Sequence, residues 1–83
     1  MALYILEYDL RKQRDYTTLT AELKRLNATR ILKSLWCLNI NNTTAVALRD
    51  HFMKFIDADD GLIVAGITDW ATIRTDANPP QFA

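Results

Sequence analysis

The pattern of apolar and polar positions divides the chain into alternating strand and helix segments. Residues 3–9 are apolar on both strand faces up to Glu7, and the segment ends at Asp9. Two-sided apolarity is typical of a central strand that is covered on both sides of its sheet. The pattern therefore predicts a central strand that closes at Asp9 and leads into a basic, polar loop over residues 11–14.

A first helix is predicted after this loop. Asp15 can cap its start by accepting backbone N–H bonds, and Asn27 can end it because Asn tolerates the left-handed conformation. Between them, apolar residues recur at spacings of three and four, which predicts one buried stripe and one side that faces water. The stripe consists of Tyr16, Leu19, Leu23 and Leu26, and the side facing water carries Glu22, Lys24 and Arg25.

Residues 30–40 are too apolar and too rich in strand-forming side chains for a loop. They form either one long strand or two strands bent near Lys33 and Ser34, since no Asn-Gly pair marks a hairpin turn there. Alternation assigns the side chains to two faces. One face carries Ile31, Lys33, Leu35, Cys37 and Asn39, and the other carries Leu32, Ser34, Trp36, Leu38 and Ile40.

A second helix follows, capped by Asn42 or Thr43. His51 lies beside its apolar stripe and is interpreted as a partly exposed structural residue, because a metal site needs further ligands within reach. The stripe consists of Leu48, Phe52, Phe55 and Ile56, while Arg49, Asp50 and Lys54 lie outside.

The last third of the chain begins with an acidic cluster, Asp57, Asp59 and Asp60, before Gly61. Its spacing does not fit an EF-hand, so a solvated turn is predicted. Residues 62–67 form the last clear strand, and residues 69–75 are a candidate for a short extra one. We expect a single domain over residues 1–75 and a flexible tail over residues 76–83.

This order of elements predicts an α+β fold, the ferredoxin-like βαββαβ sandwich, with an antiparallel sheet and both helices on one face. The other sheet face would carry Ile31, Leu35 and Cys37 and would be exposed. Large exposed apolar patches mark interfaces, so we expect a homodimer through sheet faces.

Composition limits the partners and the compartment. Ten basic side chains balance ten acidic ones, so nucleic-acid binding would have to come from a local patch. The single cysteine, Cys37, is expected in the core and allows no internal disulfide, which is typical of a cytoplasmic protein. We expect no signal peptide and no membrane partner, because no segment approaches the roughly 20 apolar residues of a membrane helix.

Three short motifs resemble a known family. "YILEYDL" at residues 4–10, "RILKSLW" at residues 30–36 and "DDGLIVAGI" at residues 59–67 resemble blocks of the small CRISPR-associated adaptation protein, the second of the numbered Cas series. A related group, the virulence-associated protein D toxins, shares the first strand and the fold. Where many members have an acidic-glycine pair after the aromatic residue, this chain has Cys37–Leu38.

The resemblance implies a homodimer in which the two Asp9 carboxylates face each other and hold one divalent cation, Mg²⁺ or Mn²⁺. The activity implied is either a metal-dependent endonuclease acting on RNA or DNA, or a nucleic-acid-binding bridge between copies of a CRISPR integrase subunit. The alternatives are a toxin-type ribonuclease related to virulence-associated protein D and a non-catalytic protein-interaction dimer. The segment at residues 70–74 could add a strand to the neighbouring protomer.

The candidate site residues follow from these motifs and from the basic loop. Asp9 is the candidate catalytic and metal-binding carboxylate. Basic side chains next to it can contact phosphate oxygens without recognising sequence. The candidate nucleic-acid-binding residues are Arg11, Lys12, Arg14 and Arg30, and the supporting residues are Tyr8, Ser34 and Trp36.

Overall fold

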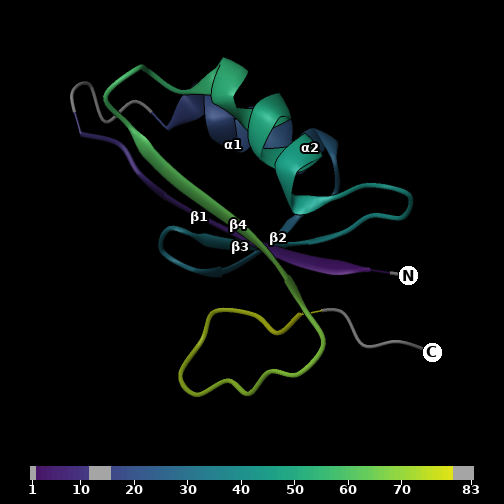
Figure 1. The fold of residues 1–83 in the computed structure, drawn as a ribbon. Coiled ribbons are helices and arrows are strands. Elements are labelled where there is room, and N and C mark those ends of the chain that lie inside the picture. Colours follow the sequence, from purple (N-terminus) through teal and green to yellow (C-terminus); the bar gives the residue numbers. More distant parts are fainter. Residues whose placement is uncertain (1, 12–15, 80–83) are drawn as a thin grey trace.

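The computed structural model describes residues 2–11 and 16–79. In these ranges the chain forms four strands, two α-helices and one short 3-10 helix (Figure 1). In chain order they are β1 (Leu3–Asp9), α1 (Thr17–Arg25), β2 (Thr29–Leu32), β3 (Leu35–Asn39), α2 (Ala45–Phe52), η1 (Met53–Phe55) and β4 (Gly61–Ile67).

The four strands form one sheet in the order β2-β3-β1-β4, and every neighbouring pair is antiparallel. The strand β1 is central, as its two-sided apolarity predicts, and it is paired with β3 on one side and β4 on the other. Both α-helices cover the same face of the sheet (Figure 1). This is the ferredoxin-like βαββαβ arrangement, and the predicted fold class is confirmed.

The main core lies between the helices and the sheet. Leu6 of β1 and Leu38 of β3 are fully buried against the inner sides of the helices. The predicted apolar stripes supply most of the helical side chains in this core, since Leu19, Leu23 and Phe52 are also fully buried. Burial of such side chains is the main favourable contribution to folding, about 1.5–3 kcal/mol for each one.

The far face of the sheet is partly covered by the chain itself. A second cluster contains Leu3, Ile31 and Cys37, and Trp70 and Ala77 of the C-terminal segment pack against it. Figure 1 shows this segment on the side of the sheet away from the helices. The sequence predicts an open far face, whereas the structure shows the C-terminal segment covering the part around Ile31.

The C-terminal segment is attached to the edge strand by its backbone as well. The amide of Asp76 donates a hydrogen bond to the carbonyl of Ile31 over 2.9 Å. No strand forms within residues 69–75, so the candidate extra strand is absent from this described segment. The division at residue 75 stays a prediction, and residues 80–83 of the predicted tail lie outside the described residues.

Local chain signals account for most element boundaries. The β2–β3 alternative is settled in favour of two strands, which turn at Lys33 and Ser34. Asn27 ends α1 with φ 59°, in the left-handed region that was expected. The expected cap Asp15 lies outside the described residues, and Tyr16 occupies the cap position that the structure describes.

The start of α2 differs from the prediction. Thr44 caps this helix rather than Asn42 or Thr43, and its hydroxyl accepts from the backbone N–H of Ala47 at 3.1 Å. The helix ends at Phe52, where the 3-10 turn η1 continues the chain. The cap falls one residue later because Thr44 has the extended backbone that a cap needs.

Candidate functional site

The candidate carboxylate Asp9 closes β1 at one end of the sheet, opposite Gly61 of β4. Side chains alternate along a strand, so Asp9 points to the same side as Leu3 and Ile5, away from the helices. Its side chain is 70% exposed. Asp9 is therefore open to solvent on the far face, where a second molecule could approach it.

Asp9 already has a cationic partner. Nε of Arg11 donates to Oδ2 of Asp9 over 3.1 Å, and Nη1 of Arg11 lies 3.4 Å from the carbonyl oxygen of Asp59. The backbone N–H of Arg11 donates to Oδ1 of Asp60 over 2.8 Å. A Cβ at Gly61 would come within 2.9 Å of Nη2 of Arg11, so the glycine gives the guanidinium room to lie against the backbone of β4.

The acidic cluster is a hydrogen-bonded turn. Oδ2 of Asp60 accepts from the N–H of Asp57 at 2.8 Å, and the N–H of Asp60 donates back to the carbonyl of Asp57 at 3.1 Å. This agrees with the predicted turn. It also has a positioning role that the sequence did not indicate, because the same Asp60 carboxylate holds the backbone of Arg11.

Within one protomer, the described residues offer few ligands for the predicted metal ion. Among residues 2–11 and 16–79, no group of three or more His, Cys, Asp and Glu side chains could hold an ion. Asp9 brings one carboxylate. Mg²⁺ retains several waters and is often bound by only one or two carboxylates. Asp9 could supply one of these carboxylates, and a second would have to come from another chain.

A cavity of about 320 Å³ lies beside Asp9, between the start of α1, the end of β1 and the β2–β3 hairpin. It brings together most of the residues that the motifs indicated, although they come from two distant parts of the sequence. The predicted residues that line it are Tyr8, Asp9, Arg30, Ser34 and Trp36, and the others are Leu10, Tyr16, Thr20 and Lys33. Arg11 lies outside it, and Lys12 and Arg14 lie outside the described residues.

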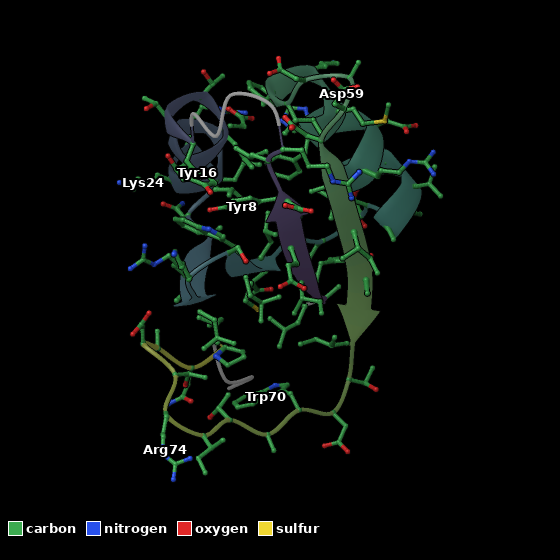
Figure 2. All side chains as sticks on the ribbon, turned by 90° about the vertical axis from the view of Figure 1, so that its left-hand side faces the viewer. Tyr8, Tyr16, Lys24, Asp59, Trp70 and Arg74 are labelled. Carbon is green, nitrogen blue, oxygen red and sulfur yellow. The ribbon has the colours of Figure 1, made fainter. Side chains whose placement is uncertain are left out.

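Aromatic side chains form one wall of this cavity. The ring centroids of Tyr8 and Tyr16 are 5.4 Å apart at an interplanar angle of 49°, and Figure 2 shows the two residues close together. Trp36 is only 5% exposed, and its Nε1 is a buried donor with no hydrogen-bond partner among the described residues. The sequence placed Tyr16 in the core stripe of the helix. Only its position at the start of the helix could have indicated that it lines the cavity.

Two cationic side chains, Arg30 and Lys33, line the cavity. Nη2 of Arg30 lies 4.0 Å from Oδ2 of Asp76, and both side chains are more than half exposed. Lys33, in the β2–β3 turn, was not predicted as a site residue, because its position depends on the hairpin that the sequence left open. Exposed pairs such as Arg30–Asp76 contribute little to stability and can exchange partners.

A separate polar cluster joins the two helices. Glu22 was predicted to face water, but it is only 7% exposed. Nε and Nη2 of Arg25 donate to its two oxygens over 2.7 and 2.6 Å, and Nε2 of His51 lies 2.5 Å from Oε2. The bonds from Arg25, and then from His51, lower the pKa of Glu22 to about 2. His51 is half-buried, as expected, and its role in this cluster is structural.

Comparisons with known proteins agree with the geometry. The family model for CRISPR associated protein Cas2 matches residues 1–74, which include every helix and strand described above. The chain belongs to the Cas2 family. Cas2 membership makes it a CRISPR adaptation protein and favours the first of the two resemblances, rather than the virulence-associated protein D group. A comparison with solved structures finds no match. Within the described residues of this Cas2 family member, no helix is long and apolar enough to cross a membrane.

Proposed function

We propose that this Cas2 family member is a homodimer that binds a nucleic-acid duplex and bridges it to the CRISPR integrase. The observation that carries the proposal is the gathering of Arg11, Arg30 and Lys33 around the end of β1, in a chain whose net charge is zero. A local group of cations can bind phosphates where the whole protein has no bulk attraction.

The open part of the far sheet face supports the dimer. Ile63 lies on this face opposite Glu7, and its side chain is 59% exposed. The C-terminal segment covers the other end of the face, around Ile31. A second copy packed on the open end would bury Ile63 and would bring the two Asp9 side chains towards each other, because they share that face.

A metal-dependent endonuclease is the second candidate, and the exposed position of Asp9 on the proposed interface favours it. Two Asp9 carboxylates could hold one Mg²⁺ or Mn²⁺, which when bound would supply an activated water and neutralise phosphate charge. The guanidinium of Arg11 would have to leave Asp9 and could then contact a phosphate oxygen.

The test compares duplex binding and cleavage in the same samples. We expect salt-dependent duplex binding that survives Asp9→Asn and weakens in an Arg30→Ala/Lys33→Ala double variant. A Lys24→Ala/Lys54→Ala variant, which removes two exposed lysines that do not line the cavity, is the charge-matched control. Lack of duplex binding at low salt would contradict the proposal and favour a protein-interaction dimer.

Cleavage separates the two candidates. Cleavage of RNA or DNA that requires Mg²⁺ or Mn²⁺ and disappears in Asp9→Asn would establish the endonuclease. If the wild-type protein binds duplex but cleaves nothing with either metal, the binding function stands alone. The integrase contact is tested by co-purification of the two proteins with and without duplex DNA. Failure to co-purify under both conditions would contradict the bridging role.

A further inference from the structure

We infer that the cavity between α1, β1 and the β2–β3 hairpin binds one unpaired nucleotide, with its base against the aromatic wall and its phosphate at Arg30 and Lys33. The inference rests on the proposed nucleic-acid binding and names the part of the nucleic acid that enters this cavity. The cavity opens on the helix side of the sheet, and Asp9, whose side chain points to the far face, lies at its border.

The size of the cavity suits a ligand of this kind. Its volume is about 320 Å³. Pockets for small molecules and cofactors span about 300–1,000 Å³, so this one lies at the lower end of that range. It is large enough for a single nucleotide and too small for a base pair with its two backbones.

The aromatic wall supplies a stacking surface. Tyr8 is buried and packs against the ring of Tyr16, which is 41% exposed and lines the cavity. Stacking on an aromatic side chain favours every base and adds roughly 5- to 150-fold in affinity for each stacked base. Bases in a duplex are already stacked on both faces, so this wall favours an unpaired one.

Trp36 adds an indole to the lining of the cavity. The residue is only 5% exposed, and its buried Nε1 has no hydrogen-bond partner among the described residues. Its indole signal can therefore report on binding in the cavity.

The charges at the cavity favour an anionic group. Arg30 and Lys33 lie on one side of the cavity, and Asp9 on the other side is paired with Arg11 at 3.1 Å. Asp76, at 4.0 Å from Arg30, is the only other carboxylate that the described contacts place near these cations. One phosphate at Lys33 and Arg30 would have two charge-assisted partners, and the hydroxyl of Ser34 is an additional donor.

The test uses the two indole signals of the protein, since the chain has only two tryptophans. In ¹⁵N-labelled protein, a Trp70→Phe variant assigns the Trp36 indole N–H resonance. Titration with adenosine monophosphate should shift the Trp36 resonance and leave that of Trp70 unchanged. Absence of a saturable shift at Trp36 would overturn the inference.

Matched variants and probes test each part of the site. Tyr16→Ala should weaken binding of adenosine monophosphate by about 5-fold or more, because it removes the exposed stacking ring. Lys33→Ala should weaken it by a similar factor, while Lys54→Ala should not change it. Adenosine alone and inorganic phosphate alone should each bind more weakly than the nucleotide. Equal affinity for phosphate and nucleotide would overturn the stacking role, and an unchanged Tyr16→Ala variant would do the same.

Two further titrations distinguish the two sources of an unpaired nucleotide, which are a strand end and a free nucleotide. A duplex with a 5′-phosphorylated single-stranded overhang that shifts Trp36 more than a blunt duplex identifies a strand end as the ligand. A shift with the free nucleotide but not with the overhang identifies a free nucleotide. If the duplex binds but neither the overhang nor the free nucleotide shifts Trp36, the cavity inference is refuted and the proposed function stays intact, so the two failures are distinguishable.

Discussion

Nε2 of His51 on α2 lies 2.5 Å from Oε2 of Glu22 on α1, which joins the two helices through a single carboxylate. Arg25 binds the same carboxylate from the next turn of α1. The pKa of Glu22 is lowered from 4.5 to about 2 by these partners. This cluster should therefore contribute to stability as long as Glu22 is ionised.

The sign of the pH dependence follows from the lowered pKa. The stabilisation from Glu22 is complete above pH 4.5 and is lost as pH falls towards about 2, because the unfolded chain takes up a proton more readily. We expect Glu22→Gln to be less stable than wild type at pH 7 and to lose less stability on acidification. Urea unfolding at a series of pH values measures both effects.

The control is Asp50→Asn, which removes an exposed carboxylate that binds its neighbour Arg49 over 2.9 Å. This variant should keep the stability of wild type within about 0.5 kcal/mol and keep its acid dependence. An unchanged acid dependence in Glu22→Gln would contradict the role of the cluster.

The packing of Trp70 on the far sheet face predicts a stability effect of the C-terminal segment. In Figure 2, Trp70 lies between this segment and the sheet, and it contacts the cluster around Ile31. Because the side chain is only partly buried, Trp70→Ala should lower the free energy of unfolding by about 2 kcal/mol. Ile73→Ala, at a 71% exposed position of the same segment, should change it by less than about 0.5 kcal/mol. Equal effects of the two substitutions on the free energy of unfolding would show that the packing of Trp70 on the sheet does not stabilise the protein.

The exposed side chain of Ile63 predicts an effect on assembly. Ile63→Glu should leave the fold intact but weaken dimerisation at least about tenfold, because a charge buried without a partner is unfavourable. Sedimentation equilibrium measures the dissociation constant. Val46→Glu, at a 56% exposed position on α2, should leave dimerisation unchanged. A wild-type protein that is monomeric at all concentrations would contradict the dimer itself.

The left-handed conformation of Asn27 predicts a backbone effect. At φ 59°, Asn27→Val should destabilise the protein by about 1–2 kcal/mol, because a β-branched side chain clashes there, while Asn27→Gly should be tolerated. Thermal unfolding of the two variants measures the difference. Asn41→Val, at an exposed position outside the positive-φ residues, is the comparison. If Asn27→Val and Asn41→Val are equally stable, the strain argument is wrong.

The fold could be predicted because its signals are local and consistent. The apolar residues on both faces of β1 required a central strand, and the spacing of Leu19 and Leu23 required a helix on one side. The hairpin at Lys33 and Ser34 could not be decided, because it turns without glycine and only the pairing of β2 with β3 defines it. Glu22 was misplaced because helical periodicity does not reveal a hydrogen-bond partner on another helix.

The site was predictable in part, for a related reason. Motifs indicated Tyr8, Asp9 and Trp36, and the structure brings them to one cavity. The remaining features depend on tertiary contacts. Residues far apart in the sequence hold Arg11 against Asp60, and the contribution of Lys33 depends on the turn that the sequence left open. No periodicity could indicate these contacts.

The Arg11 guanidinium acts towards Asp9 as a built-in counterion. Two bare carboxylates that face each other across a proposed interface would repel, and a dimer would then require a metal ion to form. Because each Asp9 carries a tethered cation, the repulsion is already offset within each protomer. In the proposed dimer, assembly would therefore not require a metal ion, and a divalent ion would have to compete for Asp9 with a guanidinium that belongs to the same chain.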